Sequence, residues 1–246
     1  SFYIPKAIES GASVVLCEEL TNTEGGVVYI VVENAAKALG ELASAFYDFP
    51  SRNIKLVGVT GTNGKTSIAT MLYQCFMNLG HSCGLLSTIK YSINGTDTVS
   101  THTTPNSVRI NELLDEMVSE GCEYAFMEVS SHALHQYRTS GLDFDGAVFS
   151  NITHDHLDYH TDFKEYLYTK KRLFDELKPE AFSLVNKDDK NGKVMVQNTA
   201  SSIYTYSLKS MSDFKTKIIE NDFDGMLLDI RGSEVWLRLV GRFNAY

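Results

Sequence analysis

The stretch VGVTGTNGKTS, residues 57–67, joins an apolar strand pattern, a glycine-rich turn and the start of a helix. Its spacing departs from the common phosphate-loop pattern G-x-x-x-x-G-K-[ST], which would place a glycine at Val59. The glycines present are Gly58, Gly61 and Gly64. Lys65 and Thr66 nevertheless open the helix directly after the turn, and the N–H groups of such a helix start point at one anion. The stretch therefore predicts a nucleotide phosphate site, with Lys65 on the β- and γ-phosphates and the Thr66 hydroxyl near a Mg²⁺ ion.

The composition is that of an ordinary globular protein. The 246 residues are 43% hydrophobic and 22% charged, and no apolar run approaches the roughly 18 residues of a membrane span. The formal net charge of −9 argues against a nucleic-acid surface, although small anions can still bind at a local nest of N–H groups. No secretory signal is visible, and the four cysteines form no C-x-x-C pair. We therefore expect buried, reduced thiols and a cytoplasmic protein.

Strand and helix patterns alternate through the middle of the chain. Near-continuous apolar segments predict strands at residues 54–60, 82–88, 124–130, 146–152 and 181–186. Helical patterns cover residues 65–80 and 107–121, and each ends at a glycine. Strands that are apolar throughout are buried on both faces. The predicted fold class is therefore α/β, with a P-loop-type, mostly parallel sheet flanked by helices.

The two ends of the chain follow other patterns. Residues 1–52 contain two apolar segments and a helical pattern at residues 35–49, which together resemble part of an α/β domain. After about Ser210, three segments predict a small antiparallel β-ribbon that turns at residues 231–233.

A candidate metal ligand follows one of the buried strands. In MEVSSH, residues 127–132, Glu128 stands at the carboxyl end of the strand. Ligands of open α/β sheets bind beyond the carboxyl ends of the strands, so a carboxylate beside a phosphate loop is well placed to hold Mg²⁺. A glutamate that only bonds a neighbouring loop is the alternative. Ser130 and Ser131 follow as possible helix N-caps.

The segment SNITHDHLDYH, residues 150–160, is rich in residues that bind metals. Its candidates are Asp155, His156, Asp158 and His160, within six positions after another buried strand. Such a group is compatible with zinc. The neighbouring phosphate loop favours Mg²⁺ instead, with one or two of these residues as ligands or as partners of ligands.

A lysine interrupts the apolar face of the helical pattern at residues 161–177. The apolar stripe of this helix consists of Phe163, Leu167, Phe174 and Leu177. Lys170 falls near the middle of the stripe, whereas Lys171 falls well off it. Burial would make a neutral, reactive amine accessible at Lys170. A lysine that extends its ammonium group to solvent is the alternative.

Two polar loops each allow two interpretations. HTTPN, residues 102–106, either binds a substrate or caps the helix that follows. In LVNKDD, residues 184–189, Asn186 and Asp188 either form a turn or contact a ribose.

Taken together, these segments resemble the Mur ligases, the ATP-dependent amino-acid-adding enzymes of peptidoglycan synthesis. The matching segments occur in the family's order: GTNGKTS, HTTPN, MEVSSHAL, NITHDHLDYH, YLYTKKRLF, NKDD and GRFNAY. The match runs from about Phe2 to Tyr246, and EVSSH with DHLDYH is most similar to the branch that adds a diamino acid as the third peptide residue. The offset glycine spacing also resembles that of this family's phosphate loop.

The resemblance implies a reaction and its participants. ATP and Mg²⁺ would be the cofactors, and UDP-MurNAc-L-Ala-D-Glu and a free diamino acid, meso-diaminopimelate or L-lysine, the substrates. The γ-phosphate of ATP would pass to the substrate carboxylate, and the amine would displace it from the acyl phosphate. The resemblance also implies a cytoplasmic enzyme, and we expect a monomer.

The resemblance assigns roles to matching positions. The ATP phosphates would contact Gly61, Thr62, Asn63, Gly64, Lys65, Thr66 and Ser67, and Asn244 would face the adenine. Mg²⁺ would be held by Thr66, Glu128 and His156. The muramoyl peptide would contact Thr103, Thr104, Ser130, Gln136 and Arg138. Lys170 matches a lysine that reacts with CO₂ to become a carbamate, and it would be catalytic together with Lys65, Glu128 and His156.

The resemblance also implies three domains. Residues 1–52 match part of a uridine-nucleotide-binding domain and residues 53–246 the central ATP-binding domain, while a C-terminal amino-acid-binding domain is absent from this sequence. We therefore expect the chain alone to bind nucleotide without turnover. Folylpolyglutamate synthase, with a similar loop and lysine, is the alternative enzyme. A P-loop switch protein is disfavoured, because nothing resembles its base-reading motif.

Overall fold

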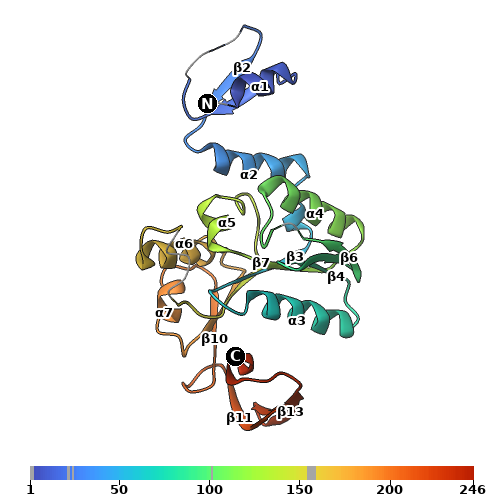
Figure 1. The fold of residues 1–246 in the computed structure, drawn as a ribbon, viewed down its shortest axis with the longest axis vertical. Coiled ribbons are helices and arrows are strands. Elements are labelled where there is room, and N and C mark those ends of the chain that lie inside the picture. Colours follow the sequence, from blue (N-terminus) through green and yellow to red (C-terminus); the bar gives the residue numbers. More distant parts are fainter. Residues whose placement is uncertain (1–2, 21–22, 24, 101, 154–158) are drawn as a thin grey trace.

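The computed structural model describes residues 3–20, 23, 25–100, 102–153 and 159–246. A large sheet forms its centre, with the strand order β13-β12-β11-β10-β9-β8-β3-β7-β4-β5-β6 (Figure 1). The parallel strands are β3 (Lys55–Thr60), β4 (Cys83–Leu86), β7 (Tyr124–Glu128), β8 (Gly146–Phe149), β9 (Phe182–Asn186) and β10 (Ser202–Ser207). The predicted α/β class with a mostly parallel sheet is confirmed.

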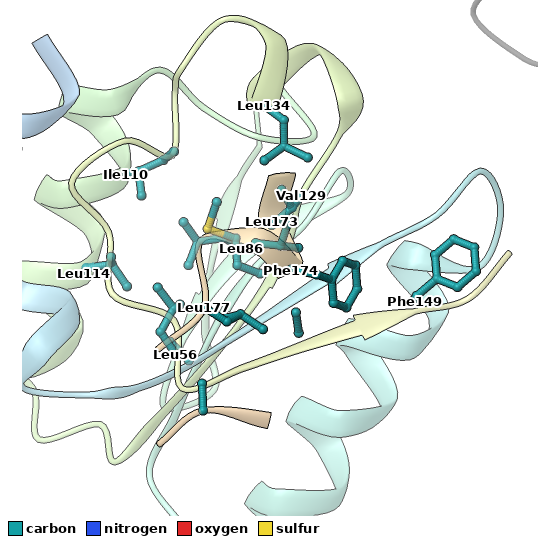
Figure 2. Packing of buried hydrophobic residues seen from close by; sticks show 14 of the residues in the cluster. Leu56, Leu86, Ile110, Leu114, Val129, Leu134, Phe149, Leu173, Phe174 and Leu177 are labelled. Atoms are coloured by element: carbon teal, nitrogen blue, oxygen red, sulfur yellow. The ribbon is translucent and has the colours of Figure 1, made fainter. Parts of the chain in front are cut away.

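Helices cover both faces of the parallel strands (Figure 1). One face carries α3 (Lys65–Asn78), and the other carries α4 (Ser107–Ser119), α5 (Ser131–His135), α6 (Phe163–Asp175) and α7 (Gly192–Met195). Successive residues of a strand point to opposite faces. Leu56 and Met127 accordingly belong to the larger core, shown in part in Figure 2, whereas Val57 and Phe126 pack on the side of α3.

Side chains of the expected types begin three of these helices. Asn106, Ser130 and Asp162 each accept a hydrogen bond from a backbone N–H one turn into α4, α5 and α6, respectively. Ser131, the other N-cap candidate, is buried inside α5, and its hydroxyl has no hydrogen-bond partner among the described residues. These caps fix the residues at which the three helices begin.

The N-terminal part contains α1 (Ile4–Glu9), β1 (Val14–Cys17), β2 (Val28–Val31) and α2 (Ala35–Phe46), and β1 pairs with β2 in parallel. The short helix η1 (Pro50–Arg52) then leads into β3. α2 lies close to the loop after α5, where Ser44 Oγ donates a hydrogen bond to the Gly141 carbonyl at 2.9 Å.

The ribbon near the C-terminus is antiparallel, as predicted. It consists of β11 (Phe214–Asp222), β12 (Gly225–Ile230) and β13 (Ser233–Leu237), and η2 (Arg242–Ala245) follows it. β10 pairs with β11 in parallel, so the ribbon continues the central sheet.

Three features differ from the sequence predictions. β10 and the hairpin of β5 (Lys90–Ile93) and β6 (Thr96–Val99) are not among the predicted strands, and the turn of this hairpin has positive φ at Asn94 and Gly95. Their polar, partly exposed residues hide the strand pattern. Cys75 is exposed on α3, whereas the other three cysteines are buried, so the expectation of four buried thiols was wrong at that position. None of the helices among the described residues is long and apolar enough to cross a membrane.

Candidate functional site

The phosphate loop lies between β3 and α3, and its glycines are structurally required. Gly61 has a φ of +150°, and a Cβ atom there would collide with Ser150 Oγ. Gly64 has a φ of +86° and is the N-cap residue of α3. Ser150 Oγ also donates to the Asn63 carbonyl at 2.6 Å. Ser150, directly after β8, therefore fixes the backbone of the loop. The first N–H groups of α3 remain suited to bind an anion.

Two lysines converge on one carbonyl of this loop. Lys65 Nζ donates to the carbonyl oxygens of Gly61 at 3.0 Å and Thr62 at 2.9 Å. Lys170 Nζ, from α6, donates to the same Gly61 oxygen at 2.9 Å. The structure thus brings the predicted reactive lysine directly to the phosphate loop, 109 positions away along the chain.

Lys170 is buried, so the alternative of an ammonium group extended to solvent was wrong. Its side chain lies inside the protein, and Nζ is 4.8 Å from the centroid of the Tyr166 ring. Lys171, which falls off the apolar stripe, is also buried and forms an ion pair with Asp175. α6 packs against both α5 and α7, which makes its buried surface wider than one stripe.

Glu128 is fully buried at the end of β7, with both carboxylate oxygens bonded. Thr66 Oγ1 donates to Oε2 at 2.9 Å, and the Thr88 backbone N–H donates to Oε1 at 2.6 Å. The glutamate therefore both bonds a neighbouring loop and reaches the phosphate site. A carboxylate beside a hydroxyl is a donor set that fits Mg²⁺, which prefers oxygen ligands. The third predicted ligand, His156, lies outside the described residues, as do Asp155 and Asp158.

Five predicted substrate residues form a second group, which we call the polar arm: Thr103, Thr104, Ser130, Gln136 and Arg138. Thr104 Oγ1 donates to the Glu128 carbonyl at 2.8 Å and accepts from the Ser130 N–H at 3.1 Å. Thr103 Oγ1 accepts from Thr88 Oγ1 at 3.1 Å.

The guanidinium of Arg138 links two other members of the polar arm, Thr104 and Gln136. Its Nη1 donates to the Thr104 carbonyl at 2.7 Å, and its Nε and Nη2 both donate to Gln136 Oε1. In HTTPN the predicted cap is confirmed at Asn106, which caps α4. Thr104 bonds the Glu128 carbonyl, and substrate binding by this segment stays a prediction.

Tyr166 is a site residue that the sequence analysis missed. It is fully buried, its hydroxyl lies 3.1 Å from Thr62 Oγ1, and its ring lies beneath the Lys170 amine. A tyrosine four residues before Lys170 shares its helix face, and this spacing was the available signal.

His160 is buried among aromatic rings near Tyr166. Neither ring nitrogen has a hydrogen-bond partner among the residues that the structure describes. The rings around it are Tyr166, Tyr159, His132 and His135. Burial lowers the pKa of His160, and the nearby His135, His132 and Lys170 lower it further against the opposing effect of Glu165.

A cavity of about 590 Å³ extends from the phosphate loop, and most of the residues that line it are polar. Its lining includes Asn63, Gly64, Ser67, Asn186, Asp188 and Asn244. The structure thus places the predicted adenine-side residue on the same cavity as the loop. A larger cavity of about 660 Å³ beside it is mostly apolar, and no residue of the loop 61–67 lines it. The smaller cavity is therefore the candidate nucleotide site.

Asp188 lies in a turn, as one interpretation predicted, and it also lines the cavity, while contact with a ribose stays a prediction. Its carboxylate accepts hydrogen bonds from the N–H groups of Leu208, Lys209 and Ser210, and from the Tyr246 hydroxyl. Partial burial would raise the pKa of Asp188, but these hydrogen bonds outweigh it and hold the pKa well below its usual range.

Comparison with known proteins points to one family. The profile described as "Mur ligase middle domain" matches residues 59–246. A Parabacteroides distasonis protein named UDP-N-acetylmuramoyl-L-alanyl-D-glutamate–2,6-diaminopimelate ligase is 53% identical over 245 residues, which cover 99% of this chain and 50% of the relative. The Bacteroides thetaiotaomicron protein of the same name is 50% identical, covering 99% and 51%. The chain spans about half the length of the relatives it matches.

Solved structures agree with the sequence relatives. A structure titled as a UDP-N-acetylmuramoyl-L-alanyl-D-glutamate–2,6-diaminopimelate ligase matches with a TM-score of 0.83 and 27% identity, covering 99% of this chain and 51% of the other. Mycobacterium tuberculosis folylpolyglutamate synthase, solved with ADP and AMPPCP, has a TM-score of 0.69 at 15% identity, covering 87% and 57%. At that identity the second likeness shows a shared fold alone.

Proposed function

Since this chain belongs to the Mur ligase family, we propose that it is the ATP-binding part of an enzyme that joins a diamino acid to UDP-MurNAc-L-Ala-D-Glu at the expense of ATP. One observation carries the proposal. Lys65 on the phosphate loop and Lys170 on α6 meet at the Gly61 carbonyl, while Thr66 of the same helix start bonds Glu128. A loop for phosphates, an oxygen ligand set and a buried amine thus lie together.

The proposed roles of the residues follow from their positions. ATP binds with its phosphates at the loop 61–67 and its base in the smaller cavity toward Asn244. Thr66 and Glu128 would hold Mg²⁺, and His156 is proposed as a further ligand. The bound ion would supply positive charge that offsets the charge of the transferring phosphoryl group. The polar arm holds the UDP-MurNAc-dipeptide so that its carboxylate faces the γ-phosphate.

Carbamylation of Lys170 fits the charges around it. The neutral amine of Lys170 attacks CO₂, a C–N bond forms, and the amine loses a proton to give a carbamate anion. Lys65 and Lys170 share one carbonyl acceptor, so as two ammonium groups they repel each other. The carbamate replaces one of these positive charges with a negative one, which turns the repulsion into attraction.

The names of the relatives favour 2,6-diaminopimelate over L-lysine as the added residue. The proposal also includes a domain boundary near residue 52 and a monomeric state. It further includes a cytoplasmic location, where ATP is available. Since the relatives are about twice as long as this chain, the proposed activity is that of the full-length protein.

Phosphate release by the full-length protein tests the proposal. We expect release to require ATP, UDP-MurNAc-L-Ala-D-Glu and 2,6-diaminopimelate together. Thermal unfolding with the UDP-MurNAc-dipeptide or with a reduced folate provides an independent comparison. Stabilisation by the folate alone would instead support a folylpolyglutamate synthase and refute the proposal.

The 246-residue chain provides a second test. We expect it to bind ATP or ADP without substrate-dependent turnover. Phosphate release by this chain that depends on both the muramoyl dipeptide and the amino acid would contradict this expectation.

A further inference from the structure

The C-terminal end of α5 carries a tyrosine where a glycine is usual. The Tyr137 N–H donates to the Leu134 carbonyl at 3.2 Å, and the Arg138 N–H donates to the Ala133 carbonyl at 2.8 Å. These two bonds define a Schellman ending, whose left-handed residue is usually glycine. Tyr137 holds that place with a φ of +55°. A bulky residue at positive φ is strained and persists only where its surroundings hold it.

Arg172, on α6, makes contacts that stabilise this conformation of Tyr137. Its guanidinium carbon lies 4.4 Å from the centroid of the Tyr137 ring. Its Nη1 donates to the Leu134 carbonyl at 3.0 Å, the same oxygen that accepts from the Tyr137 N–H. One planar cation thus contacts both the side chain and the backbone turn of the strained residue.

The strained residue separates two members of the polar arm. Gln136 precedes Tyr137 and Arg138 follows it, and the Arg138 guanidinium bonds Gln136 Oε1. The backbone conformation at Tyr137 therefore decides how these two side chains face each other and the Thr104 carbonyl.

We infer that Arg172 is a positioning residue for the muramoyl-peptide site. It keeps Tyr137 in its left-handed conformation and thereby holds Gln136 and Arg138 in the orientation that receives the substrate. The inference rests on the proposed function, under which the polar arm binds the UDP-MurNAc-dipeptide. The same helix presents Tyr166 and Lys170 to the phosphate loop, so α6 joins the two halves of the site.

A purely structural role for Arg172 makes a different prediction. Its Nη2 also pairs with Glu176 at 3.4 Å, an exposed i,i+4 ion pair on α6. Such pairs contribute little to stability. If Arg172 only stabilised α6, its loss would disturb Lys170 and the phosphate loop as much as the polar arm, and it would lower kcat and raise the KM for ATP.

Steady-state kinetics of the full-length enzyme separate these roles. We expect Arg172→Met to raise the KM for the UDP-MurNAc-dipeptide by about tenfold, with kcat and the KM for ATP changed by less than about twofold. Lys164→Met is the matched control, because it removes one exposed positive charge from the same helix. Arg172→Lys, which keeps the charge but not the planar group, should give a smaller rise of about threefold. A fall in kcat at unchanged KM for the dipeptide would overturn the inference.

A glycine at position 137 tests how Arg172 acts. Tyr137→Gly permits the left-handed conformation without steric strain. In that background we expect Arg172→Met to raise the KM by less than about twofold, so the two substitutions are non-additive. An equal effect of Arg172→Met in both backgrounds would overturn the inference.

Hydrogen exchange distinguishes a failure of this inference from a failure of the proposed function. If the wild-type enzyme does not bind the UDP-MurNAc-dipeptide, the proposed function is wrong. The positioning role is then judged by the amide hydrogens of Tyr137 and Arg138. We expect these to exchange about tenfold faster in Arg172→Met than in wild type or Lys164→Met. Unchanged exchange would overturn the positioning role.

Discussion

The phosphate loop at the start of α3 and the end of α5 both contain residues with positive φ, but the two regions stabilise them differently. In the loop, Gly61 and Gly64 adopt these conformations with no side chain to strain. At the end of α5, Tyr137 does so against its side-chain preference, and Arg172 contacts it from another helix. The positive φ angles of the loop are thus permitted by its own glycines, whereas the conformation of Tyr137 in the polar arm depends on Arg172, 38 positions from Leu134.

This difference has a consequence for function. A local glycine loop suits phosphates, which are alike in every nucleotide and are bound mainly by backbone N–H groups. The polar arm is expected to recognise one particular substrate, and the end of α5, which carries two of its residues, is contacted by Arg172 of α6. Substitutions in the loop should therefore abolish binding outright, while substitutions around the polar arm should be graded.

Lys170→Ala should have the largest effect, because the Lys170 amine lies at the phosphate loop and is proposed to carry the carbamate. We expect turnover of the full-length enzyme to fall by about a thousandfold or more, as when a group that stabilises transition-state charge is lost. Small carboxylates such as acetate should restore part of it. Lys164→Ala, an exposed lysine on the same helix, is the control. Normal turnover of Lys170→Ala would refute the carbamate role.

Gly61→Ala should damage the loop severely. A Cβ atom would meet Ser150 Oγ and the Asn151 carbonyl, and a φ of +150° disfavours any side chain. We expect a loss of about 2–4 kcal/mol in the free energy of unfolding and no measurable ATP binding by calorimetry. Gly25→Ala, at a position with nothing within 4 Å, should leave both unchanged. Tight ATP binding by Gly61→Ala would show that the loop is less constrained than its glycines indicate.

Thr104→Val should weaken the polar arm without destroying the loop. The valine keeps the shape but loses the bonds to the Glu128 carbonyl and from the Ser130 N–H. We expect the free energy of unfolding to fall by about 1–3 kcal/mol and the KM for the muramoyl dipeptide to rise, with ATP affinity retained. Thr98→Val, on the exposed edge strand β6, is the control. An equal loss of ATP affinity would remove the distinction between the two regions.

His160 lies near the rings of His135 on α5 and Tyr166 on α6. It should make the free energy of unfolding depend weakly on pH. Its folded pKa is lowered by burial, so the unfolded chain binds a proton more readily. The contribution is therefore complete above the unfolded pKa of about 6.5 and is lost as the pH falls toward the folded pKa, by at most about 1.4 kcal/mol per pH unit. Chemical denaturation between pH 5 and about 7.5 should show this slope reduced in His160→Leu and kept in His81→Gln. The same slope in wild type and His160→Leu would contradict this assignment.

Much of the fold and of the phosphate site is predictable from local sequence. Apolar strands, glycine stops and helix caps are interactions between residues close together in the chain, so their patterns are visible without coordinates. This explains why β3, α3, α4 and the ribbon were predicted, and why Gly61, Gly64, Lys65 and Thr66 were identified as a phosphate loop. The polar strands β5, β6 and β10 were not predicted, because partly exposed strands have no continuous run of apolar residues.

What only the tertiary structure decided is which distant groups meet. The sequence predicted that Lys170 lies on a buried helix face, and the fold brought its amine to the Gly61 carbonyl and above Tyr166. It likewise buried Lys171 beside Asp175 and stacked Arg172 on Tyr137. Local patterns follow from steric and hydrogen-bonding preferences of neighbouring residues. Contacts between α6 and the loops follow from how the helices pack on the sheet, and no short stretch of sequence contains that information.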